Sequence, residues 1–199
     1  MRRQLVVFVR APLMGRGKRR LARDIGDVAA LRFERSMIAL LLRRLAPDRR
    51  WHLRVAITPD NARHRAQHWH GRAEAVGQGS GDLGVRMRRA LRACPAGHAV
   101  LVGTDIPALS ARHIAAAFRV LGIRDLVFGP AEDGGFWLVG ARHPRQLPPL
   151  FERVRWSSPD TLADTLASLP RRITVGFVER LADVDDGKSY RRLAARRGL

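Results

Sequence analysis

Short apolar runs alternate with longer amphipathic segments along the chain. The runs are mostly four to six residues long, the length and pattern expected of strands buried on both faces of a sheet. Turn-forming Gly, Pro, Asn or Asp residues follow most of them and mark where a strand ends. This pattern predicts strands over residues 4–9, 53–58, 73–76, 99–102, 125–129, 136–139 and 173–178.

Between the runs, apolar residues recur every three to four positions, as an amphipathic helix requires. Asp82 and Ser110 are suited to cap helices that begin after them. Ser158 followed by Pro159 likewise predicts a helix start, with Ser158 as the cap and Pro159 at the first helical position. A Pro- and Gly-containing loop is expected between the first strand and the first helix. The pattern predicts helices over 27–45, 61–70, from 82 onward, over 110–121, over 156–169, and after "DVDD" near the carboxyl end.

Alternating strands and crossover helices predict an α/β fold with a mostly parallel sheet and helices on both of its faces. The chain shows no internal repeat and no long polar linker. We therefore expect one domain over residues 1–199.

The chain is strongly basic, with 37 Lys and Arg against 18 Asp and Glu and a formal net charge of +19. Only two of the basic residues are lysines, Lys18 and Lys188. Such charge attracts polyanions, including nucleotides. Specific nucleic-acid binding is disfavoured, because the arginines are spread over the chain and few aromatic residues accompany them as stacking partners.

The lone Cys94 excludes an intramolecular disulfide, and a reducing, cytoplasmic setting is expected. Its simplest interpretation is a small apolar side chain on a helix. Arg10 ends the first apolar run too early for a signal peptide, and later runs are too short to span a membrane. No membrane insertion is expected.

Ligands of open parallel sheets bind beyond the carboxyl ends of the strands, and conspicuous loops follow these strands. In the first loop, Gly15 and Gly17 would let backbone N–H groups turn toward an anion, while Lys18 and its arginine neighbours add positive charge. Neither a Walker loop nor a G-x-G-x-x-G motif is present. A phosphate site and a basic surface turn both remain open.

Asp105, in "LVGTDIP", follows a buried strand and is placed to hold a divalent cation that bridges a diphosphate. A carboxylate that only caps the turn is the alternative. Glu132 and Asp133, in "EDGG", could assist Asp105 or merely form a turn. Asp183 and Asp185, in "DVDD", are the other candidates for a second ligand, and one of them could instead cap the last helix.

Other chemistries find little support in the sequence. The seven histidines show no paired metal-ligand spacing, which argues against a zinc site, and no G-x-S-x-G elbow supports hydrolase chemistry. The segment "QGSGDLGVRM" offers backbone donors and Arg86 at a helix start, although a glycine-rich entry to a helix explains it equally.

Six motifs in order carry a family resemblance: "VFVRAPLMGRGKRRLA", "QGSGDLGVRM", "LVGTDIPALS", "GPAEDGGFWLVG", "WSSPDTLADTL" and "DVDD". Together they resemble a bacterial family of small transferases in the nucleotide-diphospho-sugar transferase superfamily, associated with radical-SAM/selenodomain or arsenosugar gene neighbourhoods. The resemblance runs nearly end to end. It implies a Rossmann-like GT-A fold that holds a nucleotide at its N-terminal half.

The resemblance also implies roles for individual residues. Lys18, Asp105 and Asp133 are the expected catalytic residues, and Asp105 with Asp185 would hold Mg²⁺ or Mn²⁺. Acceptor binding is expected at Glu132, Asp133, Gly134, Gly135 and Trp156. Nucleotide and phosphate binding is expected at Ala11, Pro12, Gly15, Lys18, Arg20, Gln78, Gly79, Asp82, Gly84 and Arg86.

The family commonly has K-T-R-L where this chain has Lys18-Arg19-Arg20-Leu21, so Arg19 replaces a small hydroxyl residue. Lys18 itself is kept, and a compact ammonium suits crowded phosphate oxygens better than a wide guanidinium.

Two reactions fit these expectations. In glycosyl transfer, the favoured one, a nucleoside-diphosphate sugar donates its sugar to a small-molecule acceptor. In nucleotidyl transfer, a nucleoside triphosphate donates NMP to a phosphorylated small molecule and pyrophosphate leaves. A basic nucleotide- or nucleic-acid-binding protein without catalysis is the third interpretation.

Overall fold

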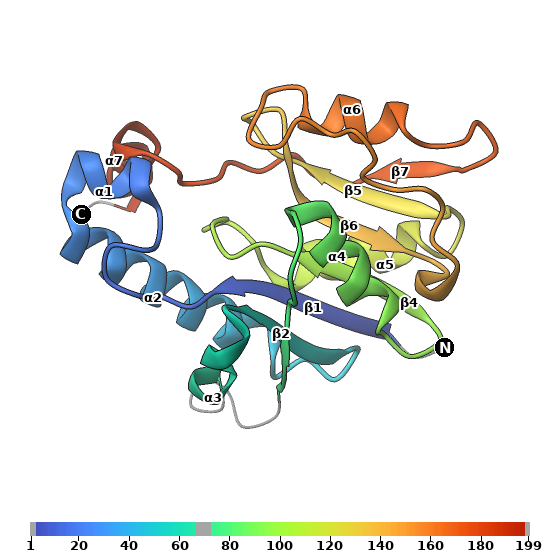
Figure 1. The fold of residues 1–199 in the computed structure, drawn as a ribbon, viewed down its shortest axis with the longest axis horizontal. Helices are drawn as coiled ribbons and strands as arrows, with labels where there is room; N and C mark the ends of the chain where they lie inside the picture. Colours follow the sequence, from blue (N-terminus) through green and yellow to red (C-terminus); the bar gives the residue numbers. More distant parts are fainter. Residues whose placement is uncertain (1–2, 67–72, 198–199) are drawn as a thin grey trace.

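The computed structural model describes residues 3–66 and 73–197, and the strands in this part of the chain form one seven-stranded sheet (Figure 1). The strands are β1 (Arg3–Arg10), β2 (His52–Thr58), β3 (Glu74–Gly77), β4 (His98–Val102), β5 (Leu126–Pro130), β6 (Phe136–Ala141) and β7 (Val175–Phe177). Their order across the sheet is β3-β2-β1-β4-β6-β5-β7. Only β6 runs against its neighbours, so the predicted, mostly parallel sheet is confirmed.

Helices connect the strands and cover both faces of the sheet. They are α1 (Arg19–Ile25), α2 (Asp27–Leu45), α3 (Arg63–Ala66), α4 (Leu83–Arg92), α5 (Ala111–Val120), α6 (Thr161–Ala167) and α7 (Gly187–Arg197), with 3-10 turns at Asp60–Ala62 and Pro144–Gln146. Among residues 3–66 and 73–197, no helix combines the length and the apolar character needed to cross a membrane.

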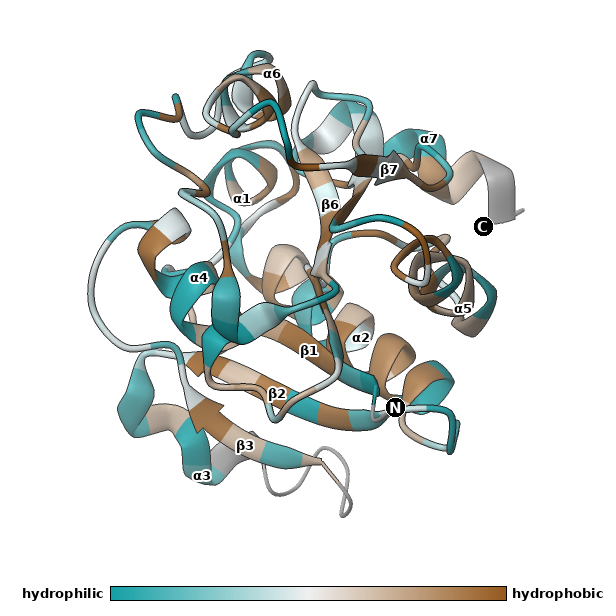
Figure 2. Cartoon of the chain, turned by 90° about the vertical axis from the view of Figure 1, so that its right-hand side faces the viewer, coloured by the Kyte–Doolittle hydropathy of each residue, from teal (hydrophilic) through white to brown (hydrophobic). Residues whose placement is uncertain are grey.

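The alternation of side chains along each strand divides the core into two clusters. Leu5 and Val7 of β1 point to the face covered by α2 and α5, whereas Val6 points to the face covered by α4 and α6. Figure 2 shows strands β1 and β2 largely in the hydrophobic colour, while α4 presents mainly hydrophilic residues to the outside. Cys94 lies in the second cluster, where burial raises the pKa of its thiol to about 11. The packing supports the predicted role of Cys94 as an apolar filler.

Most predicted elements occur at their expected positions, with three differences at helices. Helix α1 lies in a stretch predicted to be a loop. The helix predicted over 61–70 is represented by the 3-10 turn and α3, and its residues 67–70 lie outside the described part of the chain. Helix α6 begins at Thr161, because Ser158 accepts a hydrogen bond from the Asp160 N–H and forms a turn where the sequence predicted a helix cap.

Helices α1 and α7 are joined to each other. The N–H of Gly187, at the start of α7, donates to the Asp24 carboxylate of α1 over 2.8 Å. Figure 1 shows α1 and α7 side by side at the end of the molecule toward which β1 points. The first loop and the segment before α7 therefore meet at the carboxyl edge of the sheet.

A buried glutamine closes the same edge between β1 and β2. Gln78, 2% exposed, donates its side-chain amide to the carbonyl oxygens of Val9 and Ala56. Its own side-chain oxygen accepts a hydrogen bond from Arg86 over 2.7 Å. The Gln78 side chain is thus used within the protein, where it fixes the strand ends and the direction of Arg86.

Replacing Gln78 with Ala should lower the free energy of unfolding by about 2 kcal/mol, because two buried carbonyls and Arg86 lose their partner. The matched control is Gln146→Ala, whose side chain is exposed and should change stability by no more than about 0.5 kcal/mol. Urea denaturation of both variants measures the difference. Equal stability of the two variants would contradict the role assigned to Gln78.

Candidate functional site

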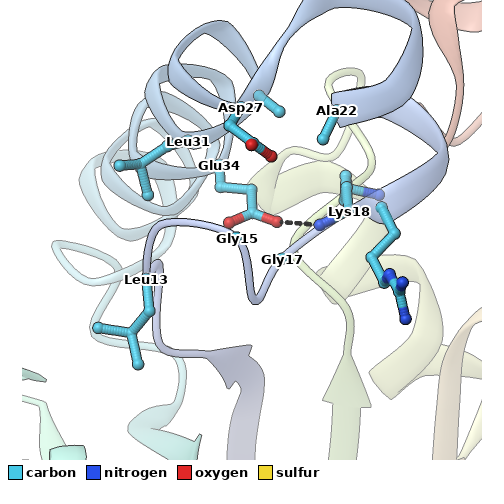
Figure 3. Close-up of a pocket in the computed structure, with 10 residues that line it drawn as sticks. Leu13, Gly15, Gly17, Lys18, Ala22, Asp27, Leu31 and Glu34 are labelled. Carbon is cyan, nitrogen blue, oxygen red and sulfur yellow. Dashed lines mark hydrogen bonds between the residues drawn. The ribbon is translucent and has the colours of Figure 1, made fainter.

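The loop after β1 is held by a residue of α2. The backbone N–H of Lys18 donates to the Glu34 carboxylate over 2.7 Å, as the dashed line in Figure 3 shows. The same carboxylate lies against the α-carbon of Gly17, where any Cβ would collide with it. Glycine at position 17 and Glu34 together bring the loop close to α2 and set the direction in which Lys18 leaves the backbone.

The Lys18 side chain reaches two carboxylates from distant parts of the sequence. Its Nζ lies 3.3 Å from Oδ2 of Asp105, after β4, and hydrogen-bonds Oδ1 of Asp185, before α7. Burial, which leaves 17% of the side chain exposed, would lower the pKa of Lys18, yet the two carboxylates raise it above its usual value. Lys18 is therefore charged and neutralises part of an acidic cluster.

Two further aspartates, Asp133 and Asp183, complete that acidic cluster. Carboxylate oxygens of Asp133, Asp183 and Asp185 lie within 4.8 Å of one another. The Val184 N–H donates to the Asp105 carbonyl over 3.0 Å and joins the last segment to the turn after β4. Burial, together with repulsion from Asp133, Asp185 and Asp105, raises the pKa of Asp183 to about 7. The cluster thus contains more negative charge than Lys18 alone offsets.

Oxygen donors in this number and proximity fit Mg²⁺ or Mn²⁺, which bind carboxylates. The grouped carboxylates are those of Asp133, Asp183 and Asp185, while Asp105 contacts Lys18. Asp186, and neither Asp183 nor Asp185, caps α7, since its carboxylate accepts from the N–H and hydroxyl of Ser189. The expectation that Asp183 or Asp185 caps this helix is therefore wrong, and both are free to face the cluster.

A glycine turn positions Asp133. Gly134 has φ of 87° and packs so closely on the backbone of Pro159 that a Cβ would overlap it. Its carbonyl accepts a hydrogen bond from Leu162 of α6, and the Asp133 carboxylate accepts one from Gly135 over 2.9 Å. The turn after β5 is therefore anchored to α6, and Asp133 projects from a defined backbone.

These side chains border a cleft with a volume of about 800 Å³. The cleft brings together many of the residues that the sequence predicted: Lys18, Arg20, Gln78, Arg86, Asp105, Asp133, Gly135, Trp156 and Asp185. The remaining predicted residues lie outside its lining: Ala11, Pro12, Gly15, Gly79, Asp82, Gly84, Glu132 and Gly134. Several of the second group have local structural roles, such as Asp82, which caps α4 by accepting from Val85.

Positive charge lines the cleft beside the acidic cluster. Besides Lys18, the cationic lining comprises Arg10, Arg16, Arg19, Arg20 and Arg86. Burial and the proximity of Arg10 lower the pKa of Arg86, although an arginine stays charged at neutral pH. These positive charges repel one another, so their grouping along one cleft indicates a surface suited to an anionic ligand.

Sequence reasoning missed two contributors to this site. Glu34 lies within a helix among arginines, and no motif marks it, because its role depends on the docking of a loop 16 residues earlier. Arg10 ends β1 and lines the cleft, whereas the sequence pattern marks it only as the end of an apolar run. A charged residue at the carboxyl end of a central strand is the one signal that could have identified Arg10.

Several solved structures share this fold. A protein of Desulfovibrio desulfuricans G20 named as a nucleotide-diphospho-sugar transferase is 26% identical, with a TM-score of 0.86 over 98% of this chain and 88% of that one. A 4-diphosphocytidyl-2C-methyl-D-erythritol synthase from Anaerococcus prevotii is 10% identical, with a TM-score of 0.66 over 100% and 96%.

A third structure is glucosyl-3-phosphoglycerate synthase from Mycobacterium tuberculosis with Mn²⁺, UDP and glucosyl-3-phosphoglycerate. It is 14% identical, with a TM-score of 0.56 over 98% of this chain and 75% of that one. No curated protein matches the sequence.

The sheet order, the mixed strand direction and these likenesses establish a GT-A-like nucleotide-diphospho-sugar transferase fold, as the sequence predicted. Residues 41–158, more than half of the chain, match the family described as "Uncharacterized protein conserved in bacteria (DUF2064)", and the chain belongs to that family.

Proposed function

We propose that this protein is a metal-dependent glycosyltransferase that uses a nucleoside-diphosphate sugar as donor. The observation that carries the proposal is the contact of Lys18 with Asp105 and Asp185 in a cleft also lined by five arginines. Such a site offers both a cation-binding cluster and a cationic surface for a diphosphate. The similarity to a protein named as a nucleotide-diphospho-sugar transferase supports the same donor class.

Asp105 and Asp185, which share the Lys18 ammonium, would hold the cation together with Asp183. The carboxylate of Asp133, which lies in the same cluster, would stay available as a base. When bound, Mg²⁺ or Mn²⁺ supplies positive charge that stabilises the departing diphosphate. Lys18 neutralises part of the charge of Asp105 and Asp185, and its ammonium would turn to the donor phosphates if a cation were held by these carboxylates. Arg20 and Arg86 would bind the phosphates with it, and the loops at Ala11–Gly15 and Gln78–Gly84, near them in the sequence, would contact the nucleotide.

In the reaction, an acceptor oxygen forms a bond to the anomeric carbon of the sugar. The bond between that carbon and the diphosphate oxygen breaks, and its electron pair leaves with the diphosphate. The acceptor proton passes to the carboxylate of Asp133, which would act as general base. Acceptor contacts are proposed for Glu132, Gly134, Gly135 and Trp156, whose segments adjoin Asp133.

Nucleotidyl transfer is the second candidate, and one observation favours it. Six cationic residues line the cleft, a strong attraction for a triphosphate. In that reaction a phosphorylated acceptor attacks the α-phosphate, and the bond to the β-phosphate breaks as pyrophosphate leaves. The same residues would stabilise the leaving group.

We further propose membership of the transferases associated with radical-SAM/selenodomain or arsenosugar gene neighbourhoods, on the six motifs. The proposal includes one catalytic domain over residues 1–199 that works in the cytoplasm, a setting supported by the unpaired Cys94.

A nucleotide panel distinguishes the candidates. With Mn²⁺ present, nucleoside-diphosphate sugars should raise the melting temperature more than nucleoside triphosphates do, because the site holds a diphosphate and a sugar together. Scanning fluorimetry with and without Mn²⁺ makes the measurement. A larger shift with triphosphates would favour nucleotidyl transfer, and the absence of any metal-dependent shift would exclude both reactions.

Asp105→Asn and Asp185→Asn should each abolish the metal-dependent part of that shift, because each removes charge from the cluster. Glu152→Gln is the matched control, since Glu152 is exposed and does not line the cleft. The metal assignment fails for either aspartate whose Asn variant keeps the full metal-dependent shift.

The two lysines allow a separate test of the proposed exchange at Lys18. Lys18→Met should weaken nucleotide binding by about tenfold, since charge-assisted hydrogen bonds to phosphate are lost. The same substitution should tighten the binding of Mn²⁺ alone, because no ammonium then competes for Asp105 and Asp185. Titration calorimetry measures both affinities.

Lys188→Met is the control, because Lys188 is exposed on α7 and should leave both affinities unchanged. Weaker Mn²⁺ binding by Lys18→Met would mean that Lys18 supports the metal site instead of competing with the metal.

A further inference from the structure

One wall of the cleft is apolar, in contrast to the charged wall described above. It lies on the face of the sheet that α4 covers and combines side chains from β1, β4, β6, α4 and the segment before α6. The apolar recess, as we name this wall, is formed by Phe8, Leu83, Met87, Leu101, Phe136 and Trp156.

The recess continues the second core cluster outward to solvent. Met87 and Leu101 are 4% and 3% exposed and form its floor, whereas Leu83 at the rim is 36% exposed. Phe136 and Trp156 stand edge to face, with ring centroids 6.4 Å apart. Apolar surface that stays partly exposed inside a cleft costs free energy unless a ligand covers it, and such surface is typical of small-molecule binding sites.

Trp156 has a hydrogen-bond donor available to such a ligand. The other described tryptophans, Trp51 and Trp137, donate their indole N–H groups to the carbonyls of Leu45 and Glu179. Within residues 3–66 and 73–197, no partner is found for the indole N–H of Trp156, which lines the cleft. A buried indole N–H usually donates a hydrogen bond. A ligand that buries Trp156 would therefore be expected to carry an acceptor atom for this N–H.

The backbone around Trp156 holds the indole in place. Phe151 and Ser157 have φ of 71° and 58°, in the left-handed region that non-glycine residues rarely adopt. Trp156 and Phe151 pack against Gly84 of α4, where a Cβ would lie 2.7 Å from each of them. The backbone conformation and the packing on Gly84 both fix the position of the Trp156 ring. The ring is therefore pre-organised for binding.

We propose that the apolar recess binds the acceptor, and that the acceptor carries an apolar ring or branched chain beside a hydrogen-bond acceptor atom. A free sugar or polyol fits this wall poorly, because the indole N–H of Trp156 is the one N–H or O–H group among these six side chains. Most hydroxyls of the sugar would lose water without gaining a partner. The recess shares its cleft with Asp133, so the attacking group of such a molecule can lie on the charged side. That the occupant is the acceptor rests on the proposed function; the preference for an apolar ring does not.

The test uses the full ¹⁵N-labelled chain and the indole N–H resonance of Trp156, assigned by its loss in Trp156→Phe. Benzyl alcohol should shift this resonance, while glucose, uridine and guanosine at equal concentration should not. A shift caused by glucose would make the recess a carbohydrate subsite, and one caused by a nucleoside would make it the nucleobase subsite. Either result, or no shift with any probe, overturns the proposal.

A rim variant separates the recess from nonspecific association. Leu83→Gln should weaken the binding of benzyl alcohol roughly tenfold, since it replaces a large part of the apolar rim. Ile123→Gln, at a 76% exposed residue after α5 that does not line the cleft, should bind it as the unmodified chain does. Equal binding by the Leu83 variant would overturn the proposal.

The outcome for the recess is independent of the nucleotide panel. If benzyl alcohol binds while no nucleotide stabilises the protein, the proposed transfer reaction fails and the recess remains a binding site. If nucleotides bind with metal while benzyl alcohol does not, the transferase stands and the apolar acceptor is excluded.

Discussion

The ammonium of Lys18 between Asp105 and Asp185 is the interaction on which the organisation of the cleft depends. It joins three segments that are far apart in sequence: the loop after β1, the turn after β4 and the approach to α7. Carboxylates this close repel one another, and burial together with this repulsion raises the pKa of Asp183. Without a cation at this point, the three segments would have an electrostatic reason to separate.

A compact cation in this place explains the choice of lysine in a chain that otherwise uses arginine almost exclusively. The Lys18 backbone is tied to Glu34, so only the side chain can respond to a change in charge. A single ammonium on a flexible stem can turn from carboxylates to phosphates, whereas a planar guanidinium needs a fixed, fork-shaped partner. The arginines, by contrast, line parts of the cleft where a spread-out positive charge is enough to attract an anion.

Much of the framework could be predicted from the sequence, because apolar runs and loop chemistry are local. The strands appear near their predicted positions, and the loops after β1 and β4 meet as the parallel arrangement requires. Helix α1 was not predictable, because its seven residues bury only Leu21 and so show no apolar period. The direction of β6 was also hidden, since a buried strand has the same pattern whichever way it runs.

The site residues that sequence reasoning missed or misjudged depend on contacts made after the chain has folded. Glu34 acts through a loop that docks on its helix. The side chain of Gln78 bonds the strand ends and Arg86, which no sequence pattern indicates, while its role in nucleotide binding stays a prediction. In "DVDD", three aspartates are equivalent by pattern, and only the position of Ser189 makes Asp186 the cap. Residue type and spacing locate a site. The tertiary structure then decides which of several similar residues can do the chemistry, because it gives each residue different partners.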